Sequence, residues 1–158
     1  MKTKYGIAPY SGLDPIYGPE MGVYTSNVFS LKSGRYCVYG TSSAGMLACA
    51  DNAAAISGFT QWTGTASATT LATKISVAYN IDQFATEMPY AASGAAATLT
   101  AAVLITIYSK LIDIFVSSNI QYADNAASQS VLRVVGGDVA ENTLYVHVVD
   151  SKMNQAAL

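Results

Sequence analysis

The stretch RVVGGDVAENTLYVHVV, Arg133 to Val149, decides how the C-terminal part of this chain folds. Two valine-rich runs flank the segment GGDVAEN, a pattern typical of a β-hairpin whose loop is longer than a two-residue turn. The two glycines are expected in the turn, where they supply backbone angles with positive φ. Alternation predicts a shared face that carries Val134, Leu144, Val146 and Val148. The opposite face of the strands then carries Arg133, Tyr145 and His147.

Upstream of this hairpin, residues 29–82 contain further short β-type runs separated by small polar turns. They are VFSL, RYCVYG, MLACA, ISGFTQWTG and a strand from Lys74 to Ile81. Several short strands at such spacing indicate a compact all-β unit of the sandwich or barrel kind.

The remaining segments complete a mainly β fold class, with small β-barrel or sandwich units and at most one short helix. Residues 1–28 hold three of the four prolines among interleaved tyrosines, which favours an extended N-terminal arm that gains order on another surface. A second β unit spans residues 83–150, includes the hairpin at 131–149 and precedes a tail at 151–158. Thr98 or Thr100 is expected to cap a helix that runs to about Ile105, before a strand at IDIFVSS.

The charge pattern argues for assembly and against nucleic-acid binding. Only 11% of the 158 residues are charged, and the formal net charge is −2. The lysines and arginines stand singly along the chain, so no basic stripe is available for phosphates. A weakly charged surface favours burial against neighbouring subunits, because little charge must be desolvated. The longest apolar segment, residues 101–116, is interrupted by Lys110 and Asp113, so no membrane span is expected. The N-terminal sequence MKTKYGIAPYSGLDPIYG has no apolar core of seven or more residues, so a secretory leader is not expected either.

Residues suited to catalysis or metal binding are scarce. Cys37 and Cys49 are too few for a structural zinc site, and reduced, half-buried thiols are favoured over a disulfide between them. His147 is the only histidine, and no partner for a general base or metal ligand lies near it in sequence. We therefore expect no catalytic, cofactor-binding or metal-binding residues, and no enzymatic activity.

The eleven tyrosines are the positive feature of the composition. Tyrosine offers a large contact area at a small cost in side-chain entropy, so it suits protein interfaces. A row of tyrosines together with Trp62 is equally suited to stacking on sugars. Packing across strands is the third possibility for each tyrosine.

Two segments resemble a known family, the capsid decoration (cement) proteins of tailed bacteriophages. The first is SLKSGRYCVYGTSSAGMLACADNAAAISGFTQ, residues 30–61, which resembles the first small β unit of that family, with its Gly turn and final "iiGf" strand. The second begins at FATEMPY and continues from LTAAVLITIYSK to LYVHV. It is similar to the part of the family fold in which an "mPy" segment, a short helix and a hairpin ending in "v.GgD...n.vyV.v" follow one another.

The resemblance implies a structural virion protein on the outer surface of an icosahedral head, assembled in the host cytoplasm. It would bridge subunits of the major capsid protein, with a homotrimer as the favoured oligomer. The residues expected at the interface are Tyr5, Tyr10, Ile16, Tyr17, Tyr24, Tyr145 and His147. The alternative is a carbohydrate-binding or receptor-binding head or fibre protein that uses tyrosines and Trp62. A small hydrolase that depends on His147 is a third hypothesis.

Overall fold

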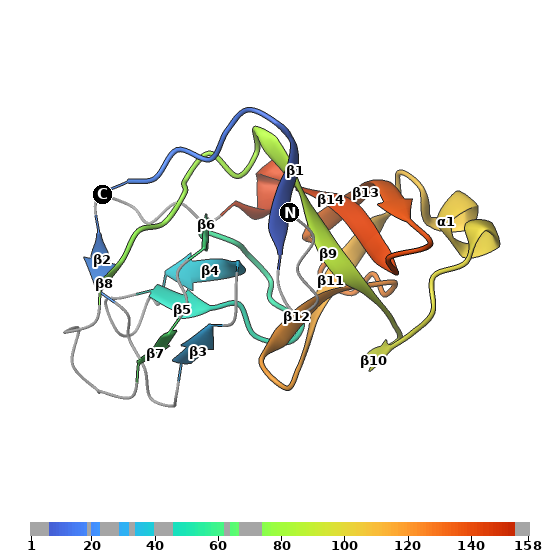
Figure 1. Ribbon diagram of the computed structural model, residues 1–158, viewed down its shortest axis with the longest axis horizontal. Coiled ribbons are helices and arrows are strands. Elements are labelled where there is room, and N and C mark those ends of the chain that lie inside the picture. The colour runs from blue at the N-terminus through green and yellow to red at the C-terminus, as the bar shows by residue number, and fades with distance from the viewer. Residues whose placement is uncertain are drawn as a thin grey trace.

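The computed structural model describes residues 7–18, 20–22, 29–31, 34–39, 46–61, 64–66 and 74–153. The predicted interface residues Tyr5 and Tyr24, the side chain of Trp62 and the expected turn at TSSAG lie outside these ranges. The fold is mainly β, as the sequence predicts, with one short α-helix in the described part of the chain (Figure 1).

The larger of the two halves is a seven-stranded sheet. Its strands are β1 (Ala8–Gly12), β9 (Phe84–Ala92), β10 (Ala95–Ala96), β11 (Leu111–Ser117), β12 (Ile120–Asp124), β13 (Leu132–Asp138) and β14 (Thr143–Val148). The main path runs β1-β9-β12-β11-β13-β14, and β9 also pairs with β14. Because β9 pairs with both β12 and β14, the strands β9, β12, β11, β13 and β14 form a closed ring. Closure leaves few unpaired strand edges.

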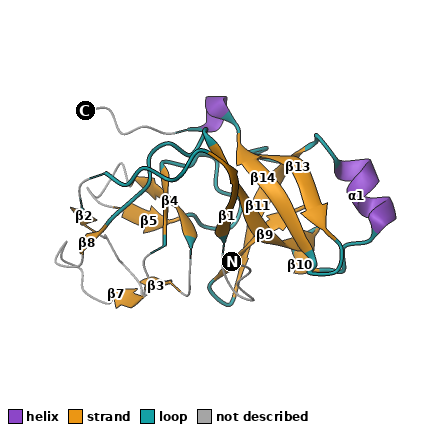
Figure 2. Ribbon diagram, turned by 45° about the horizontal axis from the view of Figure 1, so that its top comes forward, coloured by secondary structure: helices purple, strands orange, loops and turns teal. Residues whose placement is uncertain are grey.

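The other half consists of three small antiparallel sheets. Strand β4 (Arg35–Tyr39) lies between β5 (Met46–Ala48) and β6 (Gly58–Thr60). The remaining pairs are β2 (Met21–Gly22) with β8 (Lys74–Ile75), and β3 (Phe29–Leu31) with β7 (Gly64–Ala66). Figure 2 shows these short strands beside the ring. The predicted strand from Lys74 to Ile81 is wrong after Ile75, since Ala78 makes only isolated bridges to Tyr17 and Phe59.

The hairpin predicted in residues 133–149 forms between β13 and β14, but its glycines are not in the turn. Gly136 and Gly137 are paired strand residues opposite Tyr145 and Leu144, and the loop is residues 139–142. A Cβ atom on Gly136 would lie 2.9 Å from the Tyr145 ring, and one on Gly137 would lie 2.9 Å from the Thr143 carbonyl oxygen. The two glycines are therefore required because neighbouring atoms of β14 lie close to β13 at these positions, and not because the backbone adopts a positive φ. The predicted faces are confirmed: Val134, Leu144, Val146 and Val148 are buried, and Arg133 is exposed.

The N-terminal arm is the main correction to the expected organisation. Residues 1–28 were expected to lack regular structure and to lie on another surface, yet β1 pairs antiparallel with β9 of its own chain. The β1–β9 register shifts between Pro9 and Ser11, a β-bulge at Tyr10. Gly12 has φ +105, and a Cβ at this position would lie 2.4 Å from the Gln83 carbonyl oxygen. Sequence reasoning missed this strand because prolines and glycines are depleted in strands.

One α-helix, α1 (Ala101–Ile107), packs beside β13 at one end of the molecule (Figure 1). Thr100 is the N-cap, and its side chain accepts a hydrogen bond from the Val103 amide at 3.2 Å. This agrees with the predicted cap, and the helix ends two residues beyond the predicted Ile105. After the ring, Asp150–Lys152 form a 3₁₀ turn, η1, across the predicted boundary between the second β unit at 83–150 and the tail at 151–158.

The two expected β units share one hydrophobic core. Buried residues from the small sheets, including Tyr36 and Phe59, belong to the same cluster as Phe84, Met88 and Val146 from the ring. The aromatic rings of Tyr36, Phe59 and Phe84 meet edge to face, with centroids 5.8 and 5.9 Å apart. The two halves are therefore joined by packing across the position near residue 83 where the sequence placed a boundary.

Candidate functional site: two surfaces and two pockets

A stacked pair of tyrosines joins the N-terminal arm to the ring. The ring centroids of Tyr10 and Tyr145 are 3.6 Å apart, and their planes are 8° from parallel. Glu87 lies on β9 between the two strands that carry them and is opposite Tyr145. Burial, followed by the neighbouring Tyr10 and Glu87, raises the pKa of Tyr145. Two of the predicted interface residues are thus brought together, although they are distant in sequence.

Sequence reasoning missed Glu87, which is almost completely buried. Its carboxylate accepts a hydrogen bond from the Thr143 hydroxyl at 2.7 Å. Glu87 lies in the segment FATEMPY, where the alternation of polar and apolar residues does not show whether an acidic side chain is buried or exposed. The hydrogen bond from Thr143 joins the side chains of β9 and β14 next to the strand position that carries Tyr145.

We expect Tyr10→Ala to lower the free energy of unfolding by about 1 kcal/mol, because the stacked contact with Tyr145 is lost. Tyr10→Phe keeps the aromatic ring, so its free energy of unfolding is expected to be close to that of the unmodified protein. Urea unfolding of both variants checks this. Equal destabilisation by the two substitutions would show that stacking is not the cause.

Further along the arm, Ile16 and Tyr17 remain partly exposed and pair with the segment before β9. The Tyr79 amide donates to the Ile16 carbonyl oxygen at 3.2 Å, and Tyr17 bridges to Ala78. With Leu13 and Tyr79 they form a group of exposed apolar side chains, which we call the arm patch: Leu13, Ile16, Tyr17 and Tyr79. Leu13 is 63% exposed.

A second group of exposed apolar side chains lies on and beside α1. Its members, the helix patch, are Ile105, Tyr108, Val135 and Val139. Ile105, at 77%, is the most exposed large apolar residue in the described part of the chain. Figure 1 places α1 at the end of the molecule away from β2, toward which the arm segment runs. The molecule therefore carries two separate apolar surfaces.

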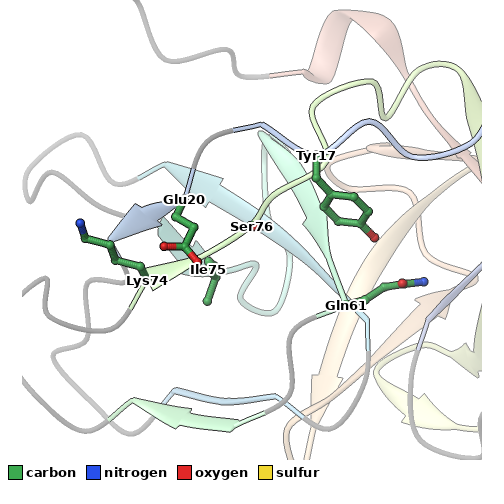
Figure 3. A pocket seen from close by; sticks show the side chains of 6 residues that line it. All are labelled: Tyr17, Glu20, Gln61, Lys74, Ile75 and Ser76. Carbon is green, nitrogen blue, oxygen red and sulfur yellow. The ribbon is translucent and has the colours of Figure 1, made fainter.

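Tyr17 also lines a pocket of about 500 Å³ together with Glu20, Gln61, Lys74, Ile75 and Ser76. Figure 3 shows the Tyr17 ring directed toward the Gln61 side of this pocket, and Glu20 beside Ile75 and Lys74. Burial raises the pKa of Tyr17. An aromatic wall combined with an amide, a carboxylate and an ammonium group is suited to a polar ligand that has an apolar face.

His147 lies on β14 directly opposite Arg133 of β13. Its Nδ1 is 3.2 Å from the carbonyl oxygen of Val148. Both side chains line a second pocket of about 380 Å³ at the end of the β13–β14 ladder. Tyr145 and His147 are therefore on one strand, but His147 faces a different feature from the tyrosine pair.

The two cysteines are free and buried. Cys37 pairs with Ala48, so Cys49 is placed beside Tyr36 and on the opposite face of the β4–β5 pair from Cys37. This register explains why a disulfide across the two strands does not form. The thiols are free, as predicted, but they are fully buried rather than half-buried.

Both thiols are expected to be unreactive toward Ellman's reagent in the folded protein. Burial raises the pKa of Cys37 to about 12 and that of Cys49 well above its usual value, and only the thiolate reacts. Two thiols should become reactive after addition of denaturant. Rapid reaction in native buffer, or fewer than two thiols after unfolding, would contradict this assignment.

Within the described ranges, no group of three or more histidine, cysteine, aspartate or glutamate side chains is arranged to hold a metal ion. In the same part of the chain, no helix is long and apolar enough to cross a membrane. Comparisons of the chain with protein-family models, curated proteins and solved structures gave no match.

Proposed function

We propose that this protein is a non-enzymatic structural subunit that binds the outer surface of an icosahedral phage capsid and bridges neighbouring major capsid subunits. The observation that carries the proposal is the presence of two separate apolar surfaces, the arm patch and the helix patch, on one closed β framework. Exposed apolar groups of this kind favour contact with another protein. A chain with 11% charged residues loses little free energy by desolvating charge at such contacts.

Bridging follows from the separation of the patches. A subunit that contacts two neighbours in a lattice binds the second one at high effective concentration, so modest contacts are sufficient. The resemblance of residues 30–61 and of the FATEMPY and LYVHV segments to capsid decoration proteins supports the same proposal. A homotrimer in solution and localisation on the virion belong to this proposal.

Co-sedimentation with expanded capsids that lack decoration protein tests the proposal. Saturable binding at a fixed ratio to the major capsid protein is expected. Because β1 pairs with β9, deleting the arm would also remove a strand of the sheet, so point variants are preferable. Ile16→Asp and Ile105→Asp change one patch each, and Thr98→Asp is the control at an exposed position.

Each patch variant alone is expected to weaken capsid binding at least about tenfold, and the control is expected to bind normally. Light scattering of the free protein measures the oligomeric state. Absence of saturable binding, or full binding by the variant with both patches changed, would rule out the bridging role.

The pocket beside Tyr17 favours a second candidate function, binding of a carbohydrate. The Tyr17 ring would stack on a sugar, and the Gln61 amide and Glu20 carboxylate would bond its hydroxyls. A glycan array compares the unmodified protein with Tyr17→Ala and Tyr17→Phe. Signal that is lost in the alanine variant and kept in the phenylalanine variant supports this function, whereas no signal on the array removes it.

A further inference from the structure

The second pocket, at the end of the β13–β14 ladder, combines two nitrogen-rich side chains with an apolar wall. Arg133 and His147 face it from neighbouring strands, and Val135, Val148 and Val149 line it with Asp150. Its volume of about 380 Å³ lies in the range of small-ligand sites. Val135 also belongs to the helix patch, whereas Arg133 and His147 belong neither to an exposed patch nor to the pocket beside Tyr17.

Arg133 and His147 are direct cross-strand partners on the outward side of the ladder. Two side chains that can both be cationic are an unfavourable pair at such positions unless an anion lies between them. The Arg133 guanidinium donates from Nη1 to the Ser109 carbonyl oxygen at 3.1 Å. In the described part of the chain this is its one hydrogen bond, and a guanidinium has five N–H donors. The remaining donors are therefore available to a ligand.

The geometry of His147 adds a second donor in one protonation state. A carbonyl oxygen only accepts, so the contact between Nδ1 and the Val148 carbonyl places a proton on Nδ1. In the neutral ring Nε2 then carries no proton and cannot donate. In the imidazolium form Nε2 carries a proton and donates to an anion. Nε2 of the imidazolium is therefore a second donor toward an anion in this pocket.

We propose that this pocket binds a carboxylate group carried on an apolar body, with Arg133 and His147 as the binding residues. The planar guanidinium matches the two oxygens of a carboxylate. Val135 and Val149 match an aliphatic group attached to it. Asp150 lines the same pocket and repels a phosphate dianion more strongly than a single negative charge. Two sources carry this chemistry: the C-terminal residue of a peptide and a small branched carboxylic acid.

The test uses the His147 imidazole signal in the NMR spectrum of the full-length protein, which is unambiguous because the chain has one histidine. The probes are a tetrapeptide ending in leucine, the same peptide as its C-terminal amide, isovalerate and inorganic phosphate. The free-acid peptide, isovalerate or both are expected to shift the signal saturably, whereas the amide leaves it unchanged. Isovalerate binding identifies the carboxylic-acid source, and binding of the peptide alone identifies the chain terminus.

Variants of the pocket residues show whether a loss of ligand binding is caused by the changed side chain or by a change in folding. Arg133→Gln is expected to weaken binding at least about tenfold, whereas Lys152→Gln removes a nearby positive charge outside the pocket and should leave binding unchanged. Asp150→Asn should strengthen binding. The His147→Ala variant, followed by calorimetry, should bind the carboxylate probe more weakly. Circular dichroism verifies that each variant is folded.

Three results would overturn the proposal. They are a shift of equal size with the amidated peptide, unchanged affinity in Arg133→Gln, and tighter binding of phosphate than of either carboxylate. A His147 signal that no carboxylate probe moves would also reject the site. None of these outcomes depends on capsid binding, so the pocket and the bridging role are tested independently.

Discussion

Gln121→Leu is expected to lower the free energy of unfolding by at least about 3 kcal/mol, equivalent to a decrease in Tm of roughly 10 °C for a chain of this size. Gln121 lies on β12 of the ring and is buried. Its side chain reaches the backbone of the small sheet, where Tyr36 belongs to β4 and Cys49 follows β5. The substitution therefore removes a polar connection between the two halves of the molecule.

Three hydrogen bonds form this connection. Oε1 of Gln121 accepts from the Tyr36 amide at 2.9 Å, and Nε2 donates to the carbonyl oxygens of Tyr36 and Cys49, both at 3.0 Å. After substitution by leucine, the Tyr36 carbonyl still accepts from the Cys49 amide. The Tyr36 amide and the Cys49 carbonyl lose the bonds to Gln121, and each buried group left without a partner costs about 1–3 kcal/mol.

Two comparisons make this prediction specific. Gln83→Leu is the same change at an exposed residue whose Oε1 accepts one long bond of 3.3 Å, and it should cost less than about 0.5 kcal/mol. Gln121→Glu places a carboxylate oxygen opposite two carbonyl oxygens, so its free energy of unfolding should be lowered at neutral pH. Part of this stability should return near pH 4, where the carboxylate becomes protonated. Thermal unfolding at both pH values measures these differences. Similar stability of Gln121→Leu and Gln83→Leu would disprove the connection.

The parts of the fold that the sequence predicts are those governed by local pattern. Burial on one face of a strand repeats every second residue, so the buried valines of β13 and β14 could be assigned correctly. The cap of α1 was also predictable, because a threonine before an apolar run leaves few other positions for a helix to begin. Most of the short strands around β4 were found by the same reasoning.

Contacts between distant segments could not be predicted in this way. Tyr36 and Gln121 are 85 positions apart, and no periodicity connects an amide side chain to the backbone it will bond. The glycines of β13 were placed in the turn because the sequence does not show that the Tyr145 ring needs the space beside Gly136. Strand β1 was missed because pairing with β9 outweighs the low strand propensity of Pro9 and Gly12.

The sequence predicted several residues of the candidate site, but not how their side chains contact one another. Tyr10 and Tyr145 are both predicted at an interface with a partner, and the sequence does not show that they stack on each other. Arg133 and His147 were predicted on the same face, but their direct pairing was not, since it depends on the register of the hairpin. A β-bulge between Val134 and Gly136 shifts the register of β13 against β14 and so decides which residue faces Arg133. One extra residue in a strand has no clear signature in the sequence.

Asp113→Asn and Asp124→Asn are expected to change stability in opposite directions at neutral pH, although the two residues are paired across β11 and β12. The Asp113 carboxylate is buried and accepts four hydrogen bonds. Its Oδ2 accepts from the amide and hydroxyl of Ser128, both at 2.7 Å, and its Oδ1 accepts from the amides of Gln129 and Ser130 at 2.9 and 2.6 Å. An asparagine would direct an NH₂ group at two of these donors.

Asp124 is also buried, but fewer donors compensate its charge. Oδ2 accepts from the Gly94 amide at 3.0 Å, and in the described part of the chain Oδ1 has no hydrogen-bond partner. Burial, with added repulsion from Asp113 and Asp51, raises the pKa of Asp124 despite the amide donors. For Asp113 burial acts in the same direction, but the bonds from Ser130, Ser128 and Gln129 outweigh it and lower the pKa.

The pH dependence follows from these two directions. Asp113 binds its proton more weakly in the folded state, so its contribution to stability is present above the unfolded pKa and is lost as the pH falls through the folded value. Asp124 binds its proton more tightly in the folded state, so its contribution is complete below the unfolded pKa and is lost as the pH rises through the folded value. Both unfolded values are near 4.

At pH 7 we therefore expect Asp113→Asn to cost at least about 3 kcal/mol, since charge-assisted hydrogen bonds are lost and donors remain unpaired. Asp124→Asn should stabilise the protein by about 1 kcal/mol, because it removes a poorly compensated buried charge and keeps an acceptor for Gly94. Urea unfolding from pH 3.5 to 7 should show the advantage of Asp124→Asn growing as the pH rises, and the deficit of Asp113→Asn shrinking as the pH falls. If Asp124→Asn is as destabilised as Asp113→Asn at pH 7, the Asp124 charge is compensated, and the two carboxylates have equivalent roles in the fold.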